Sequence, residues 1–173
     1  FSDGGPGCRW VGNERGIAGA TNWAFLRKNT VYPGYPKHYE LQYGHADGDQ
    51  WTPSECDVSI RPGWFYHAQQ DNQVKSPQQL ADIYYRSVGH NGTMLLNFPV
   101  NRDGLIHPID STNAVKFREI IDNDFKTNLI AGMKAKATNT RGKRFSTAAM
   151  TDNDYDTYWA TTDGTNTATV TYQ

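Results

Sequence analysis

The sequence predicts an α/β domain followed by an all-β domain, and two observations predict this order. Between residues 76 and 123 a helical pattern, a short apolar run, a polar loop and a second helical pattern follow one another, as in repeated β/α units. After residue 128 the chain becomes rich in Thr and Asn and ends in the alternating run 168–172, which is typical of strands. We therefore expect one domain at 1–128 and the start of a β-sandwich at 129–173.

The first helix is predicted by the signal at its amino end. Ser76 is followed by Pro77 and, two residues later, by Gln79, which is the pattern of a capping box with proline at the first helical position. Residues at helical spacing then continue up to Gly89. They are Leu80, Ile83, Tyr84, Ser87 and Val88. The sequence thus predicts a helix over 77–88.

A strand and a second helix are predicted after this helix. Residues 93–98 form a short apolar run bounded by turn residues, as expected of a strand that is buried on both faces. The polar loop 99–104 follows, and apolar residues at helical spacing then predict a helix over about 111–123.

The part of the chain before residue 76 predicts short strands separated by long loops. Residues 1–3 are expected to end a strand, and residues 39–43 and 63–66 are expected to form strands. Loops this long in a compact domain are usually functional. In a (β/α) barrel such loops leave the carboxyl ends of the strands, where active sites lie. The residues expected on that face are Glu14, Trp23, Trp51, Glu55, Trp64 and Arg102.

Composition excludes several classes of partner. The 17 Lys and Arg residues nearly balance the 18 Asp and Glu residues, so no basic surface suggests nucleic acid or an anionic membrane. No apolar run approaches the roughly 20 residues of a membrane span. The five Trp and ten Tyr residues can fill a core or stack on the apolar face of a sugar ring. The two cysteines, Cys8 and Cys56, lack the spacing of a zinc site.

Three segments, in order, resemble one known family: FSDGGPGCRWVGNERGIAGATNW, WTPSECDVSIRPGWFYH and SVGHNGTMLLNFPVNRDGLIHP. They are similar to the second half of the catalytic barrel of the family 29 glycoside hydrolases, the retaining α-L-fucosidases. The similarity is greatest to the branch that prefers α-1,3/1,4-linked fucose. It covers residues 1–128 and implies the second half of a (β/α)8-type barrel. Residues 134–173 resemble the first third of a discoidin-like, galactose-binding β-sandwich of the family 32 carbohydrate-binding type.

The resemblance also implies a function and partners. The expected function is that of a retaining exo-glycosidase that removes terminal α-L-fucose from glycans and needs no cofactor for catalysis. A non-catalytic carbohydrate-binding protein is the alternative. The family nucleophile, an aspartate, is expected before Phe1, so the chain is expected to act only with an amino-terminal barrel half and to be inactive alone. Fucosylated glycans are the expected partners, and a secreted, periplasmic or cell-surface location is expected.

Two carboxylates are candidates for the chemistry. A retaining glycosidase needs two carboxyl groups about 5–5.5 Å apart, of which one is the nucleophile and the other the proton donor. The donor must keep its proton near neutral pH, which requires partial desolvation or a nearby negative charge. Glu14, in the Gly-Asn-Glu motif, resembles the family acid/base, and a surface pair with Arg15 is the alternative. Glu55 is a second candidate for the acid or for substrate binding, and its alternative is a buried pair with Arg61.

The remaining candidates would bind the sugar. Arg9 resembles the family arginine that reaches the sugar ring or the nucleophile, because its fork of donors suits a carboxylate or paired hydroxyls. Trp64 resembles the aromatic residue that packs against the fucose methyl and ring face. Trp10, Trp23 and Trp51 are candidates for shaping the subsites of the aglycone. For each tryptophan, packing in the core is the alternative.

An acidic string near the carboxyl end is a candidate metal site. Asp152, Asp154 and Asp156 lie within five residues, and a hard cation with oxygen ligands commonly holds such a string. No glycine stands at the sixth position and no glutamate at the twelfth, so the string is not an EF-hand loop. We expect either a structural calcium site or, equally, a solvated acidic turn.

Overall fold

The computed structural model describes residues 7–173 and divides the chain into two compact units. The first unit runs to Asp124 and the second from Phe125 to Gln173, so the division falls slightly before the expected boundary at 128. The strand end expected at 1–3 lies outside the described residues.

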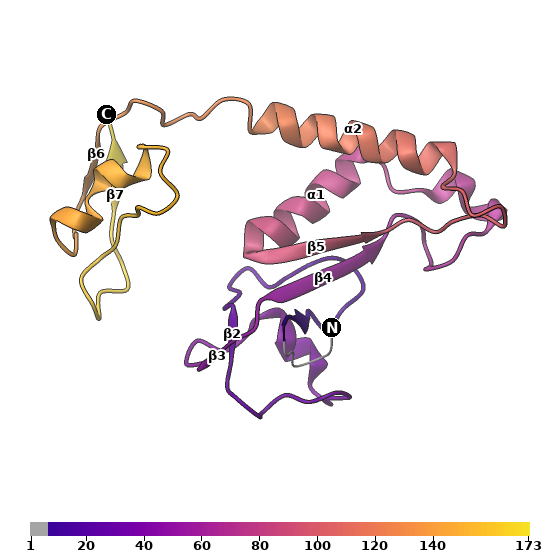
Figure 1. Ribbon diagram of the computed structural model, residues 1–173, viewed down its shortest axis with the longest axis horizontal. Coiled ribbons are helices and arrows are strands. Elements are labelled where there is room, and N and C mark those ends of the chain that lie inside the picture. Colours follow the sequence, from indigo (N-terminus) through magenta and orange to yellow (C-terminus); the bar gives the residue numbers. More distant parts are fainter. Residues whose placement is uncertain (1–6) are drawn as a thin grey trace. The chain divides into compact units, whose positions relative to one another are not determined.

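The first unit is built on a parallel sheet of three strands in the order β1-β4-β5 (Figure 1). They are β1 (Arg9–Trp10), β4 (Ser54–Ser59) and β5 (Gly92–Asn97). Both pairs are parallel, so all three carboxyl ends lie at one edge. The helix α1 (Pro77–Ser87) connects β4 to β5, which makes the β/α unit that the sequence predicts.

The helix α1 forms because its amino end is capped as predicted. The Ser76 hydroxyl accepts a hydrogen bond from the Gln79 amide, and the Gln79 side chain accepts one from the Ser76 amide. The helix ends at Ser87, one residue before the predicted end. A second helix, α2 (Pro108–Asp124), packs on α1 and begins three residues earlier than predicted. The prediction of both helices is therefore confirmed.

The central strand β4 has one apolar face and one polar face. Cys56 and Val58 are buried on the apolar face, where Cys56 packs with Val11 and Ala18. Glu55 and Asp57 alternate with them, as the two-residue period of a strand requires. This alternation places the polar side chains of β4 on one side of the sheet and the core on the other.

The strand β5 is not buried on both faces, which corrects the prediction for 93–98. Its residues alternate between more and less exposed positions, and Leu95 is 49% exposed. The reason is that β5 lies at the edge of the described sheet, and Leu95 pairs in register with Asp57 on the polar face.

Two further strand predictions are wrong. Residues 39–42 lie in the 3-10 helix η1 (His38–Gln42), and Tyr43 follows it. The only buried residue of η1 is Leu41, so the alternating pattern there serves no sheet face. Residues 63–65 form a bend and residue 66 is irregular, so no strand forms over 63–66. The remaining elements before α1 are two short antiparallel strands, β2 (Phe25–Leu26) and β3 (Gln50–Trp51), and the 3-10 helix η2 (Ala68–Gln73).

The second unit contains one antiparallel pair of strands. They are β6 (Ala135–Ala137) and β7 (Val170–Tyr172). Two short 3-10 helices lie between them, η4 (Lys143–Phe145) and η5 (Thr147–Met150). Across the described residues 7–173, no helix has the length and apolar character that a membrane crossing requires.

Candidate active site

The structure brings together Glu14 and Trp64, two residues that the sequence singles out separately. Glu14 follows β1 and Trp64 follows β4, and because these parallel strands are neighbours, their carboxyl ends meet at one edge. The Trp64 indole N–H donates a hydrogen bond of 2.9 Å to Oε2 of Glu14. The Glu14 side chain is exposed in this chain, so the desolvation expected for a proton donor is not present. Its hydrogen-bond partner is the Trp64 indole.

The loop that carries Glu14 is shaped by its neighbours in the Gly-Asn-Glu-Arg-Gly string. Both side-chain atoms of Asn13 are used: Nδ2 donates to the Ile17 carbonyl and Oδ1 accepts from the Arg15 amide. Gly16 has φ +72, and a Cβ there would lie 2.8 Å from the Ile83 side chain of α1. Glycine is therefore required at this position, and the loop is fixed on both sides of Glu14.

The loop that carries Trp64 is fixed from β4 and β5. The Ser59 hydroxyl donates to the Gly63 carbonyl at 2.7 Å, and the Asn97 side-chain amide donates to the Trp64 carbonyl at 3.1 Å. Asn97 also donates to the Ser59 hydroxyl. These bonds tie the backbone at Trp64 to the ends of two strands, so the indole is presented to Glu14 from a rigid support.

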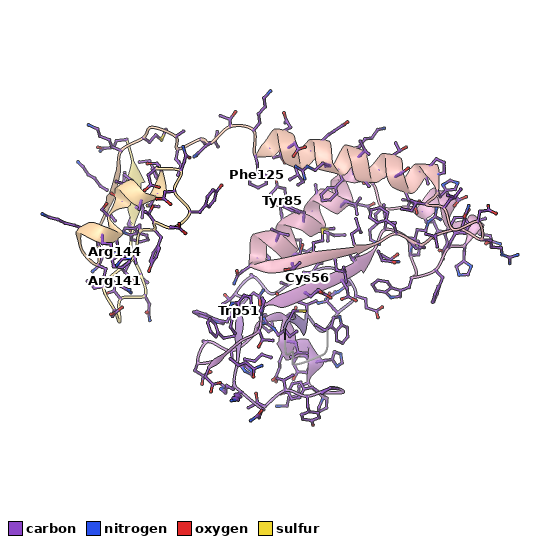
Figure 2. The ribbon with its side chains drawn as sticks, viewed as in Figure 1. Trp51, Cys56, Tyr85, Phe125, Arg141 and Arg144 are labelled. Carbon is purple, nitrogen blue, oxygen red and sulfur yellow. The ribbon has the colours of Figure 1, made fainter. Side chains whose placement is uncertain are left out.

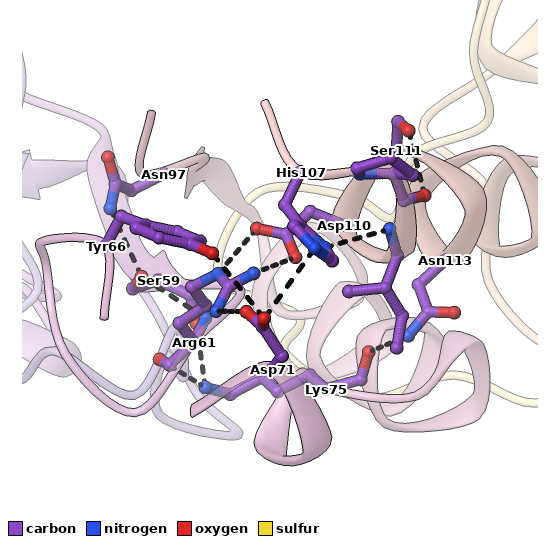
Figure 3. Close-up of polar contacts among 12 residues, drawn as sticks. Ser59, Arg61, Tyr66, Asp71, Lys75, Asn97, His107, Asp110, Ser111 and Asn113 are labelled. Carbon is purple, nitrogen blue, oxygen red and sulfur yellow. Dashed lines mark hydrogen bonds and ion pairs between the residues drawn. The ribbon is translucent and has the colours of Figure 1, made fainter. Parts of the chain in front are cut away.

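A buried ion-pair network includes residues of the segment that follows β4 (Figure 3). The Arg61 guanidinium, which is 1% exposed as a residue, donates to both carboxylate oxygens of Asp110 at 2.7 and 2.8 Å. It also donates to Asp71 at 2.9 Å. The Tyr66 ring packs on the guanidinium, with its centroid 4.6 Å from the Arg61 Cζ. The network joins the loop after β4 to the start of α2.

Glu55 lies on β4 and does not pair with Arg61, so the buried pair considered for it is wrong. Its Oε2 accepts a hydrogen bond from the Cys8 thiol at 3.7 Å. Burial raises the pKa of the Cys8 thiol, and the Glu55 carboxylate adds to this rise. Glu55 lies near the amino end of β4. It is on the same face of the strand as Asp57 but two residues further from the carboxyl end, near which Glu14 lies.

Asp57 is a carboxylate near the site that the sequence analysis missed. It is 9% exposed, and its Oδ1 accepts a 2.7 Å hydrogen bond from the Trp10 indole. Burial raises the pKa of Asp57, and the charges of Glu14 and Glu55 add to this rise against the Trp10 hydrogen bond. The signal in the sequence was the two-residue spacing of Glu55, Asp57 and Ser59, which marks one polar face of a strand. Trp10 therefore contacts a site carboxylate.

Arg9 is held inside the chain. Its side chain is fully buried, and it donates to the carbonyls of Leu41, Thr52 and Trp23 and to the Asn22 side chain. Burial lowers the pKa of Arg9 to about 10. The guanidinium is used to join β1 to the loops around it, so the geometry gives Arg9 a structural role in this chain and no contact with Glu14 or Trp64.

Trp23 and Trp51 lie at the opposite edge of the sheet from Glu14. Trp51 ends β3, shortly before the amino end of β4 (Figure 2), and the Trp23 carbonyl accepts from Arg9 at the start of β1. Trp23 is 47% exposed and Trp51 is 63% exposed. The expectation that these two tryptophans share one face with Glu14 and Trp64 is therefore wrong, because Trp51 precedes β4 and the Trp23 backbone contacts Arg9, the first residue of β1.

The acidic string is organised by its own backbone. Asp152 accepts from the Asp154 amide and the Thr157 hydroxyl, and Asp154 accepts from the Asp156 amide. Within residues 7–173, no three His, Cys, Asp or Glu side chains are grouped to hold a metal ion. The geometry therefore supports the acidic turn and gives no support to a calcium site.

The fold and the site are typical of one class of protein. Active sites of α/β barrels lie at the carboxyl ends of parallel strands, and most glycoside hydrolases use a pair of carboxyl groups that flank the scissile bond. The sequence pattern of the α-L-fucosidase family matches residues 27–120. The chain belongs to this family. Glu55 and Trp64 lie within the matched range, and Glu14 precedes it.

Individual relatives agree with this assignment. Alpha-L-fucosidase 1 of Arabidopsis thaliana is 39% identical over 169 residues, which cover 96% of this chain and 33% of the relative. The crystal structure of SpGH29 is similar with a TM-score of 0.88 at 33% identity, over 98% of this chain and 37% of that chain. A Ruminococcus gnavus GH29 fucosidase in complex with fucose has a TM-score of 0.79 at 37% identity, over 95% of this chain and 34% of that one. The chain thus spans about a third of the length of these relatives.

Proposed function

We propose that this chain forms the second half of the catalytic barrel of a retaining α-L-fucosidase, with Glu14 as the acid/base. The observation that carries the proposal is the hydrogen bond from Trp64 to Glu14 at the carboxyl edge of the parallel sheet. Membership of the α-L-fucosidase family supports the substrate class, and the R. gnavus relative binds fucose. The branch specific for α-1,3/1,4 linkages, the carbohydrate-binding sandwich around β6 and β7, and a location outside the cytoplasm belong to the same proposal.

The proposed mechanism has two steps. In the first, a nucleophilic carboxylate contributed by the amino-terminal part of the barrel attacks the anomeric carbon, while Glu14 protonates the leaving oxygen. In the second, the Glu14 carboxylate accepts a proton from water, which attacks the glycosyl-enzyme intermediate and releases fucose. The Trp64 N–H suits this cycle because it donates to the carboxylate and leaves the second oxygen of Glu14 for the proton.

Replacement of Glu14 by Gln in the full-length enzyme tests the proposal. Turnover of natural fucosides should fall by about 10²–10⁴-fold, because general acid catalysis contributes that much. Aryl fucosides with good leaving groups should retain faster cleavage, since they need no proton, and azide should restore turnover by replacing the activated water.

Glu55→Gln is the matched control, since Glu55 is a carboxylate on the same sheet but near the amino end of β4. We expect it to leave the dependence on the leaving group unchanged. If Glu55→Gln shows the loss that depends on the leaving group and Glu14→Gln does not, the assignment of the acid/base is wrong. If the unmodified enzyme binds fucosylated glycans without cleaving them, the protein is a carbohydrate-binding protein instead.

A further inference from the structure

We propose that a pocket beside Trp64 is a subsite for the neutral sugar to which the fucose is attached. The pocket has a volume of about 680 Å³ and lies between the segments 65–69 and 100–103. Pockets for small ligands commonly measure about 300–1,000 Å³, so a pyranose ring with its substituents fits. The inference rests on the proposed function, because it assigns the sugar on the far side of the bond that would be cleaved.

The position of the pocket follows from the order of the strands. One wall follows β4 and includes Phe65, the residue after Trp64, and the other wall follows β5. Both walls therefore lie at the carboxyl edge that carries Glu14. Asn97 at the end of β5 donates to the Trp64 carbonyl, so the two walls are joined directly next to the residue that contacts Glu14.

Contacts within the chain hold both walls of the pocket. Tyr66, in the first wall, packs on the buried Arg61 guanidinium and donates to Asp71. In the second wall, Oδ1 of Asn101 accepts from the amides of Asp103 and Leu105, both at 2.9 Å. A bridge between Val100 and Ile106 closes the same loop. A pocket with fixed walls loses little conformational entropy on binding.

The side chains that face the pocket suit a neutral pyranose. The Phe65 ring is 78% exposed, and an aromatic ring can stack on the apolar C–H face of a sugar. Arg102 is exposed, and among the residues that the structure describes nothing forms a hydrogen bond or an ion pair with its guanidinium. Its planar donors can bind neighbouring hydroxyls. The Arg102 charge is offset by Asp103 in the same wall, so the pocket carries no net charge that would require an acidic sugar.

Kinetics with two substrates test the inference in the full-length enzyme. One substrate is a neutral fucosylated trisaccharide, and the other is an aryl α-L-fucoside, which has no acceptor sugar. Phe65→Ala and Arg102→Ala should each raise KM for the trisaccharide about 5- to 10-fold, as expected for loss of one stacking or charged polar contact. Values of kcat/KM for the aryl fucoside should stay within about twofold. Phe65→Tyr, which keeps the ring, should keep the original KM.

Matched controls come from the same unit. Tyr39→Ala removes an exposed ring and Arg118→Ala an exposed guanidinium, each outside the pocket, and neither should change KM for the trisaccharide. Both pocket side chains are exposed, so thermal unfolding should show unchanged folding. Equal losses on both substrates, no loss on either, or a requirement for an acidic acceptor sugar would each overturn the inference.

A binding experiment separates this inference from the proposed function. N-acetyllactosamine, which carries no fucose, is titrated into the full-length enzyme and followed by NMR. We expect shifts at the Gln69 and Arg102 resonances that Phe65→Ala abolishes. If these shifts occur while the full-length enzyme cleaves no fucoside, the pocket is correct and the proposed function is wrong. If the enzyme is active and no shifts occur, the pocket assignment is wrong.

Discussion

The Trp64 indole N–H lies 2.9 Å from Oε2 of Glu14, and the two residues are 50 positions apart in the sequence. The contact exists because β1 and β4 are parallel neighbours, which brings the loops after both strands to one edge. An N–H that donates to a carboxylate fixes the orientation of that carboxylate. Trp64 is therefore a partner of the proposed catalytic group as well as a ring that a sugar can contact.

Trp64→Phe separates these two roles of Trp64. The variant keeps an aromatic ring and loses the donor, so Glu14 loses its orientation while stacking on the sugar remains. In the full-length enzyme we expect kcat on a natural fucoside to fall about 5- to 10-fold, because a hydrogen bond to a charged group contributes about 1.5–3 kcal/mol and exposure of Glu14 reduces this. KM should change little. A raised KM with unchanged kcat would show that the indole acts only by contact with the sugar.

The Arg61–Asp110 pair predicts a large loss of stability. Asp110 is 0% exposed, so Arg61→Ala leaves a buried carboxylate without its bidentate partner. Breaking such a pair costs about 3–5 kcal/mol, which urea unfolding of the chain will measure. Arg118→Ala is the control, because its pair with Asp122 on α2 is exposed and should contribute below about 0.5 kcal/mol. Similar losses for the two variants would contradict the structural importance of the network.

Local features of the fold could be predicted from the sequence because neighbouring residues determine them. The capping box at Ser76 needs only Pro77 and Gln79, and the structure contains both of its hydrogen bonds. The alternation at 39–43 failed for the opposite reason. A two-residue period predicts a strand only where a partner strand exists, and the turn bonds Glu40 N to Lys37 O and Tyr43 N to Glu40 O form instead.

The site could be predicted only in part because its contacts cross long stretches of sequence. Glu14 and Trp64 could each be selected from a motif, but their hydrogen bond depends on strand order. Asp57 was missed because its partner, Trp10, is 47 residues away and its importance comes from register with β1. Trp23 and Trp51 were expected on the same face as Glu14, although they lie near the amino ends of β1 and β4. Which end of a strand a residue occupies could not be read before the strand bounds were known.

Leu80 and Leu95 provide a test of which apolar residues form the core. Leu80 on α1 is 0% exposed and Leu95 on β5 is 49% exposed. Leu80→Ala should therefore destabilise the chain by about 2–5 kcal/mol through a buried cavity. Leu95→Ala should cost less than about 1 kcal/mol in this chain, because half of the side chain is already in water. Urea unfolding of both variants will compare them, and equal costs would show that the polar face of β4 and β5 is covered in solution.

Asp57 predicts a pH dependence of stability whose sign follows from its burial. Burial raises the pKa of Asp57 in the folded chain above its ordinary value of 3.8. Below that value the carboxyl is protonated in both the folded and unfolded states, and its contribution to stability is fully present. As the pH rises through the folded pKa, ionised Asp57 is disfavoured in the fold, and this contribution is lost.

Asp57→Asn removes this loss because the amide does not ionise, while its oxygen can still accept from the Trp10 indole. We expect the variant to be more stable than the original chain at pH 7, with the difference in melting temperature shrinking toward pH 4. Asp82→Asn is the control, since Asp82 is an exposed aspartate on α1 and should not produce this pattern. Melting temperatures measured by calorimetry between pH 4 and 7 decide the question. If the difference in melting temperature between Asp57→Asn and the original chain stays constant over that range, folding does not raise the pKa of Asp57 and this prediction is wrong.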